Sequence, residues 1–403
     1  MSDPTEIKGG ITAPQDFQAA SLYCGIKETN ASKEDIALIF SQVPAVAAGV
    51  FTTNQVKAAP VLISRTHLRL APTARAIIAN SGNANACTGP EGLESARRMC
   101  RATAAALSLR PREVLVCSTG RIGVQLPIAK MEAAISRFPA RLGPHSRKAA
   151  QAIMTSDSFP KEIAVECAIA GRPVRIGGIA KGAGMIDPNM ATMLSFVTTD
   201  AVIARSDFQK ALRASVAQSF NRITVDGDMS TNDTVLALAN SRAGNSPLAW
   251  GSPAFPAFQA ALDRVTAALA RMIVKDGEGV SRFIDLQLTG ARSDRDARLA
   301  ARAVANSMLV KCAWFGGDPN WGRIMDAVGY SGARIRENRI RIAYNGIPAV
   351  QGGMPAPTPV SRLRAVARKK EFTITVDLGL GSGSFRIWTT DLTPKYVEFN
   401  MGE

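Results

Sequence analysis

Two kinds of hydrophobic pattern alternate along the chain. Short apolar runs bounded by turn residues predict buried strands. They lie at residues 35–40, 47–51, 76–79, 114–117, 174–180, 193–198 and 223–225, with strictly alternating runs at 372–378 and 384–390. Apolar residues at three- and four-residue spacing predict helices at 90–107, 128–153, 206–220, 256–274 and 294–308. Because strands and helices do not alternate regularly, the pattern predicts a layered α/β (α+β) fold.

One predicted strand follows a loop that suits a backbone break. The loop KGAGMIDPNMAT (181–192) contains two glycines and a Pro-Asn pair, and it brings Ala191 and Thr192 to the start of strand 193–198. The Thr192 hydroxyl could attack the Ala191 carbonyl and form an ester that water opens. The new N-terminal Thr192 would then carry a nucleophile and a base, because an α-amine has a pKa of ~8. The residues alone also fit an ordinary strand start.

The composition restricts which chemistry is available. The chain has 403 residues, 46% of them hydrophobic, which is ample for one large domain or two. Its six cysteines lack CxxC spacing and its only histidines are His67 and His145, so no metal cluster is predicted. The N-terminus lacks the pattern of a secretory signal, and no apolar run approaches the ~20 residues that span a membrane. We therefore expect a soluble, cytoplasmic protein without a membrane anchor.

The formal charge of +15 raises nucleic-acid binding as an alternative function. The basic residues are mostly arginines spread along predicted helices, aromatic residues make up only 6%, and no nucleic-acid-binding motif is present. A basic solvated surface that attracts small acidic substrates explains the charge equally well.

Several turns carry candidate chemistry. The loop NSGNANACTG (80–89) is rich in Asn and Gly, which tolerate positive φ. Strand 114–117 ends in Ser118-Thr119-Gly120, a glycine-containing turn whose exposed N–H groups suit an anion or oxyanion. The turn DGDMSTNDT (226–234) lacks the spacing of a calcium loop and is interpreted as structural. At residues 206–209, Ser and Gln have the spacing of a capping box that opens a helix.

Separate motifs along essentially the whole chain resemble the ornithine acetyltransferase family of arginine biosynthesis, also called glutamate N-acetyltransferases. The motifs are GVFTTNQVKAAPV (49–61), NSGNANACTG (80–89), MTSDSFPK (154–161), KGAGMIDPNMATML (181–194) and VKCAWFGGDPNWGR (310–323). The resemblance implies an αββα sandwich of the self-processing N-terminal-nucleophile type. It also implies autocleavage at Ala191–Thr192 into an α chain of residues 1–191 and a β chain of 192–403, assembled as an α2β2 heterotetramer.

The resemblance also implies roles for individual residues. Thr192 is the nucleophile, and the Thr119 hydroxyl and Gly120 amide form the oxyanion hole. The implied substrate-binding residues are Thr155, Lys181, Thr192, Glu278, which binds the substrate amine, and Asn400. Residues expected beside the active site are Asn80, Gly82, Asn83 and Asn85.

The implied reaction is a two-step transfer. Thr192 takes the acetyl group from N-acetylornithine, ornithine leaves, and glutamate takes the acetyl group. No cofactor is implied; acetyl-CoA is possible as a donor, although no CoA-binding pattern is present. The alternatives are an amidase or aminopeptidase of the same fold, with water as acceptor, or a basic nucleic-acid-binding protein.

Three residues depart from the family pattern: Arg121 replaces a small apolar residue, Met229 a polar residue and Phe283 a lysine. The chain also stops at Glu403, before the Ser or Thr with which the family usually ends. These departures leave the choice of substrate open.

Overall fold

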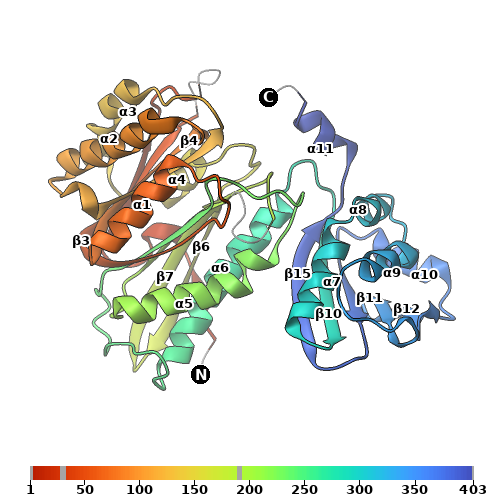
Figure 1. The fold of residues 1–403 in the computed structure, drawn as a ribbon. Coiled ribbons are helices and arrows are strands. Elements are labelled where there is room, and N and C mark those ends of the chain that lie inside the picture. Colours follow the sequence, from red (N-terminus) through yellow and green to blue (C-terminus); the bar gives the residue numbers. More distant parts are fainter. Residues whose placement is uncertain (1–2, 28–32, 188–192, 402–403) are drawn as a thin grey trace. The chain divides into compact units, whose positions relative to one another are not determined.

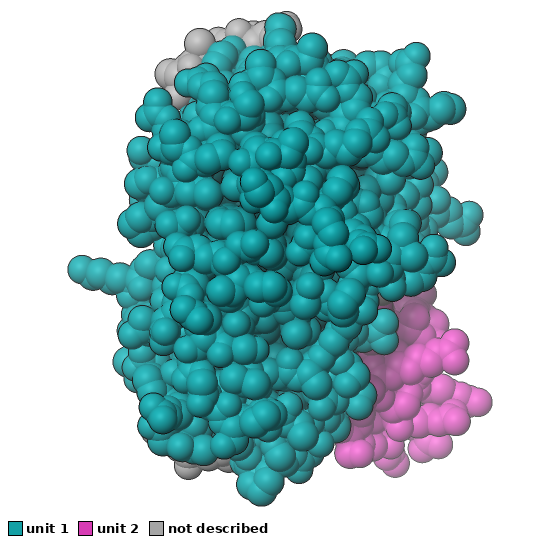
Figure 2. Space-filling view, turned by 90° about the vertical axis from the view of Figure 1, so that its left-hand side faces the viewer, with its two compact units in different colours: residues 1–185, 189–221, 228–273 teal, residues 186–188, 222–227, 274–403 magenta. Residues whose placement is uncertain are grey.

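The computed structural model describes residues 3–27, 33–187 and 193–401 (Figure 1). The chain forms two compact units (Figure 2). Unit 1 consists of residues 1–185, 189–221 and 228–273, and unit 2 of residues 186–188, 222–227 and 274–403. Unit 1 therefore contains chain from both sides of the predicted cleavage site, and the units are not the predicted fragments. The cleavage itself stays a prediction, because Ala191 and Thr192 lie outside the described residues.

Unit 1 contains a large mixed sheet. Its strands are β1 (Thr5–Ile7), β2 (Phe17–Leu22), β3 (Ile36–Phe51), β4 (Thr73–Asn83), β5 (Val114–Arg121), β6 (Lys161–Ile169), β7 (Arg172–Lys181), β8 (Leu194–Thr199) and β9 (Thr234–Ala239). They are ordered β1-β6-β7-β8-β9-β3-β4-β5, with β2 paired to β3. The β3 strand is longer than predicted, because runs 35–40 and 47–51 are one strand with a register shift between Phe40 and Ala45. Its first part pairs with β4 and its last part with β9, so β3 joins two parts of the sheet.

Most helices of unit 1 cover the two outer faces of this folded sheet, whereas Ala149, Ala150 and Ala152 of one short helix belong to the core between its strands. The helices of unit 1 are α1 (Ala59–Leu70), α2 (Gly89–Leu107), α3 (Ile128–Ile135), α4 (Ser146–Ala152), α5 (Arg205–Gln218) and, for nearly all its length, α6 (Phe255–Lys275). Alternate β5 residues divide between two cores: Val116 joins the core under α2 and α3, and Leu115 joins the core shared with β8 and β9. On β7, Gly178 lies against Val265 and Leu269 of α6. The order helices, strands, strands, helices (Figure 1) confirms the predicted αββα sandwich.

Unit 2 has a separate sheet and core. Its strands are β10 (Phe283–Ala291), β11 (Arg341–Tyr344), β12 (Ile347–Gln351), β13 (Met354–Pro355), β14 (Glu371–Asp377) and β15 (Gly383–Thr390), ordered β13-β12-β11-β14-β10-β15. The helices are α7 (Asp294–Asn306), α8 (Met308–Phe315), α9 (Trp321–Gly329), α10 (Val360–Ala367) and α11 (Pro394–Phe399). The predicted terminal strands are confirmed, and β10 lies between them, parallel to β14 and antiparallel to β15.

Three local predictions are corrected. Helix α5 begins at Arg205 without a side-chain cap; the Gln209 amide instead accepts from Gly49 N at 3.1 Å and donates to Gly49 O at 3.0 Å. The helical pattern at 128–153 is broken into α3, a 3-10 turn and α4, because proline and glycine residues interrupt it. The run 223–225 forms only an isolated bridge between Ile223 and Trp388. Within the described part of the chain, no helix has the length and apolarity needed to cross a membrane.

Candidate functional site

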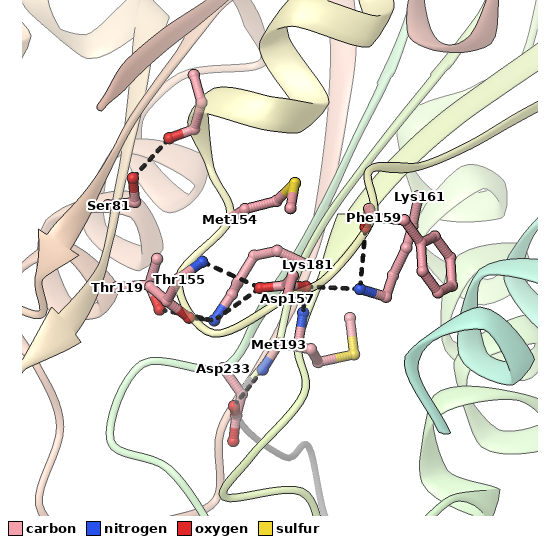
Figure 3. A network of polar contacts seen from close by, with 12 residues as sticks. Ser81, Thr119, Met154, Thr155, Asp157, Phe159, Lys161, Lys181, Met193 and Asp233 are labelled. Atoms are coloured by element: carbon pink, nitrogen blue, oxygen red, sulfur yellow. Dashed lines mark hydrogen bonds and ion pairs between the residues drawn. The ribbon is translucent and has the colours of Figure 1, made fainter. Parts of the chain in front are cut away.

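Three predicted site residues of unit 1 meet around one buried ammonium group. Lys181 ends β7 and is only 2% exposed. Its Nζ donates to the Thr155 Oγ1 at 2.6 Å and lies 3.3 Å from the Thr119 Oγ1 (Figure 3). Thr119 comes from β5 and Thr155 from the loop before β6. The structure therefore brings Lys181 next to Thr119, which lies 62 positions earlier in the sequence.

A buried carboxylate balances the charge of Lys181. The Asp157 Oδ1 accepts from Lys161 Nζ at 2.6 Å and from Gly182 N at 2.7 Å, while Oδ2 accepts from Thr155 N at 3.0 Å. The Asp157 Oδ2 also lies 3.9 Å from Lys181 Nζ. Although burial acts to raise the pKa of Asp157, the charges of Lys181 and Lys161 and the Gly182 amide lower it to about 2. Asp157 is therefore ionised at neutral pH and orients both Thr155 and Lys181.

Sequence reasoning did not single out Asp157 or Lys161. Both lie in the motif MTSDSFPK, where only Thr155 was assigned a role. Their spacing of four residues is common at exposed positions, and the sequence gives no sign that both side chains are fully buried. The one feature of the sequence that could have indicated these residues is the presence of two charged side chains within a motif that otherwise predicts a substrate loop.

The predicted oxyanion turn requires glycine for a steric reason. Gly120 has a φ of 130°, and a Cβ there would lie 2.2 Å from the carbonyl carbon of Gly82 and 2.4 Å from the nitrogen of Asn83. This close approach follows from the parallel pairing of β4 with β5, which places Gly82 opposite Gly120. The Ser118 hydroxyl donates to Asn80 Oδ1 at 2.6 Å, and Asn80 Nδ2 donates to Asn83 O at 2.9 Å. The predicted loop from residue 80 and the predicted turn from residue 118 are corrected here, because β4 continues through Asn83 and β5 through Arg121. The end of β4 therefore braces the end of β5, which contains Thr119 and Gly120.

The strand that follows the predicted cleavage site is held at its first described residue. Met193 N donates to Asp233 Oδ1 at 2.9 Å (Figure 3). Thr234 N donates to Met193 O at 3.1 Å. Asp233 is 0% exposed, and burial raises its pKa well above the usual range. Among the described residues, none donates a hydrogen bond to Asp233 Oδ2. The sequence interpretation of DGDMSTNDT as a structural turn did not identify Asp233 as a contact of Met193.

The two remaining predicted substrate residues lie together in unit 2. Asn400 Nδ2 donates to Glu278 Oε2 at 3.0 Å. Asn400 follows α11 and is exposed, and Glu278 is half-buried in the turn after α6. A carboxylate that remains accessible to solvent suits an amine of a small substrate.

The residues that depart from the family pattern have different surroundings. Arg121 is exposed at the end of β5. Phe283 is 4% exposed at the start of β10, where its ring lies 5.4 Å from Lys275 Nζ. Met229 accepts a hydrogen bond on its backbone oxygen from Asn54 Nδ2 at 3.1 Å. The described residues contain no group of three or more His, Cys, Asp or Glu side chains suited to hold a metal.

The chain is similar along nearly its whole length to known proteins. Residues 18–402 match the model of the ArgJ family. The arginine biosynthesis bifunctional protein ArgJ of Symbiobacterium thermophilum is 47% identical over 98% of each chain, and that of Geobacter sulfurreducens is 48% identical over 95% of this chain and 98% of its own. A crystal structure of the arginine biosynthesis bifunctional protein ArgJ from Bacillus halodurans is 41% identical, with a TM-score of 0.51, and covers 53% of this chain and 100% of that chain.

Proposed function

The chain belongs to the ArgJ family, and on this premise we propose that it transfers acetyl from N-acetylornithine to glutamate through an acetyl ester of Thr192. Family membership makes the chain an acyltransferase of arginine biosynthesis. The observation that carries the proposed mechanism is the buried Lys181 ammonium, which joins the hydroxyl groups of Thr155 and Thr119.

The Lys181 contact makes Thr119 a hydrogen-bond donor toward substrate. An ammonium group can only donate, so the Thr119 oxygen accepts from Lys181 and its own hydrogen is directed elsewhere. The exposed Gly120 offers an amide at the same end of β5. Together these donors suit the negative oxygen that forms when a nucleophile attacks an acetyl carbonyl. One such donor is commonly worth ~3 kcal/mol in the transition state.

In the proposed transfer, the Thr192 oxygen attacks the acetyl carbonyl of N-acetylornithine while the Thr192 α-amine takes the hydroxyl proton. The carbon–nitrogen bond then breaks, and the departing ornithine nitrogen takes that proton. The glutamate amine attacks the acetyl ester, which returns the Thr192 hydroxyl. Lys181, Thr155 and Asn400 bind substrate, and Glu278 binds the substrate's amine.

The free amine of Thr192 requires prior autocleavage. The Thr192 oxygen attacks the Ala191 carbonyl, and the hydroxyl proton moves to the Thr192 nitrogen as the peptide bond breaks. Water then opens the resulting ester. The products 1–191 and 192–403 stay together because β8 and β9 lie in the sheet between β7 and β3. The full match of a solved ArgJ chain to 53% of this one supports cleavage, since residues 192–403 are just over half of the chain.

We further propose that the paired fragments assemble as an α2β2 heterotetramer in the cytoplasm, that no cofactor is needed and that nucleic acid is not a partner.

A transfer assay tests the proposed reaction, with acetyl-CoA as a second donor in a separate arm. The purified protein is incubated with N-acetylornithine and glutamate, and ornithine and N-acetylglutamate are measured. Equal amounts of the two products are expected. Continuous release of ornithine without glutamate would indicate an amidase and contradict the proposal.

A further inference from the structure

A five-residue segment, Ser230–Thr234, connects parts of unit 1 that are far apart in sequence. It lies immediately before and at the start of β9 and is buried throughout. Its backbone accepts hydrogen bonds from the Thr52 hydroxyl and from Ala58 N, both after β3. The segment is thus a fixed part of the sandwich, although its composition resembles that of a solvated turn.

Asn232 in this segment binds the end of β5, which contains the proposed oxyanion hole. Its Nδ2 donates to Ser118 O at 2.8 Å and to Ala84 O at 2.6 Å. Ser118 O belongs to the peptide group that carries Thr119 N, so this contact sets the peptide plane entering Thr119 and Gly120. The Asn232 Oδ1 accepts from the Thr231 hydroxyl at 2.6 Å. With both ends of its amide occupied, the side chain has one orientation.

The next residue, Asp233, binds Met193, which follows the proposed nucleophile in the sequence and directly precedes β8. Its Oδ1 accepts from Met193 N, the nitrogen of the Thr192–Met193 peptide group. Thr234 N donates to Met193 O, so Met193 is held through both its N–H and its C=O. Two consecutive residues therefore each bind the direct sequence neighbour of a proposed catalytic residue: Ser118 before Thr119, and Met193 after Thr192.

We propose that Asn232 and Asp233 are positioning residues that together set the distance between the nucleophile and the oxyanion hole. This inference rests on the proposed function. Because the two residues are adjacent, their Cα atoms are only ~3.8 Å apart. Met193, which Asp233 binds, and Ser118, which Asn232 binds, are therefore held relative to each other through one peptide unit. A displacement of ~1 Å in such geometry can cost 10²-fold in rate.

The chain offers matched controls at the other ends of the same two strands. Asn240 follows β9, is as buried as Asn232, and donates its Nδ2 to Gln15 O at 2.7 Å. Asp200 follows β8, is as buried as Asp233, and accepts from Arg175 N at 2.8 Å and from Gln15 N at 3.2 Å. Asn240 and Asp200 thus make similar buried contacts with backbone groups but bind no neighbour of a proposed catalytic residue.

The experiment compares Asn232→Ala with Asn240→Ala, and Asp233→Ala with Asp200→Ala, beside the wild type. Thermal unfolding, the rate of fragment appearance by intact mass, and kcat and KM for N-acetylornithine are measured. We expect Asn232→Ala and Asp233→Ala to slow cleavage, and to lower kcat of the cleaved protein by roughly 10²-fold with little change in KM. Asp233→Asn, which keeps an oxygen to accept from Met193 N, should restore most of the activity.

The controls should lose stability to a similar extent while cleavage and kcat stay within a few-fold of wild type. Equal losses in both members of a pair would show a purely structural role and overturn the inference. Wild-type rates in Asn232→Ala and Asp233→Ala would overturn it as well. Failure of the wild type to cleave or to transfer acetyl would instead contradict the proposed function, so the two failures are distinguishable.

Discussion

The two groups of proposed substrate-binding residues differ sharply in their surroundings. In unit 1, Lys181 is 2% exposed and donates to two threonines beside the buried Asp157. In unit 2, the exposed Asn400 and half-buried Glu278 share a single hydrogen bond. The first group is a network in which each member restricts the others, and the second is a simple pair accessible to water.

This difference indicates a division of labour. Charged groups removed from water interact strongly and hold one geometry, which suits the stabilisation of a transition state. An exposed pair is screened by solvent and gains little energy from its own contact, so it can exchange that contact for a substrate amine. We therefore expect changes in the buried group to affect kcat, and changes in the exposed pair to affect KM.

The largest effect should come from Thr192→Ala, which removes the proposed nucleophile. The variant should remain one uncut chain of 42.7 kDa and show no acetyl transfer. Intact mass after prolonged incubation and the transfer assay check both points. Thr192→Ser keeps a hydroxyl and is the control that should still be cut. A Thr192→Ala protein that separates into two fragments would refute the cleavage mechanism.

Asp157→Asn should break the buried group as a whole. The variant leaves Lys161 and Lys181 without their carboxylate. Removal of one partner of a buried ion pair typically lowers the free energy of unfolding by about 3–5 kcal/mol, and we expect a loss of that order here. Thermal unfolding at neutral pH measures the loss, with Asp326→Asn, at an exposed position on α9, as a control.

The pH dependence of stability gives an independent check on Asp157. Its pKa falls from 3.8 to about 2 on folding, so the ionised form is favoured in the folded protein. The resulting stabilisation is present above pH ~4 and is lost as the pH falls from there toward about 2. Wild type should lose this contribution over that range and Asp157→Asn should not. Parallel curves for the two proteins would contradict the assignment.

Thr119→Ala removes one donor of the buried group and leaves Lys181 in place. We expect kcat to fall by about 10²–10³-fold with KM nearly unchanged, because the lost contact strengthens in the transition state. Steady-state kinetics with N-acetylornithine and glutamate test this. If KM rises instead and kcat is unaffected, Thr119 is a ground-state contact and its assigned role is wrong.

The smallest effect is expected in the exposed pair. Glu278→Gln keeps the shape of the side chain but loses the charge that would bind the ornithine amine. We expect KM for N-acetylornithine to rise by roughly 10-fold, with kcat within about 2-fold of wild type. Glu398→Gln, an exposed position on α11, is the matched control. A fall in kcat without a change in KM would contradict the proposed distinction between the two groups.

The sequence predicted the elements of the fold well where the pattern is local. Strands such as β7 and β8 and the helix α6 follow from continuous apolar runs or a clear helical face. The continuity of β3 could not be predicted. Its pairing with β4 shifts register after Phe40, and its last part pairs with β9 instead. Gln209 was misjudged for a similar reason: its partner, Gly49, is 160 residues away.

For the candidate site, motif resemblance identified residues whose contacts no spacing predicts. Lys181, Thr155 and Thr119 are in contact, although the hydrophobic pattern alone gives each of them an ordinary position at the end of a strand or in a loop; their roles toward substrate stay a prediction. The sequence did not indicate Asp157, which binds Thr155 and lies beside Lys181, or Asn232, which binds Ser118 next to Thr119, because polar residues in turn-like segments are usually exposed. Only the tertiary structure shows that these segments are inside.

The most direct test of the proposed mechanism is the mass of the 192–403 fragment during turnover. The enzyme is mixed with N-acetylornithine in the absence of glutamate, quenched in acid and measured as intact fragments. The account predicts that this fragment gains one acetyl group, that peptide mapping places the group on Thr192, and that added glutamate removes it. A fragment that stays at its unmodified mass while ornithine accumulates, or that carries the acetyl group elsewhere, would contradict the acetyl-Thr192 intermediate.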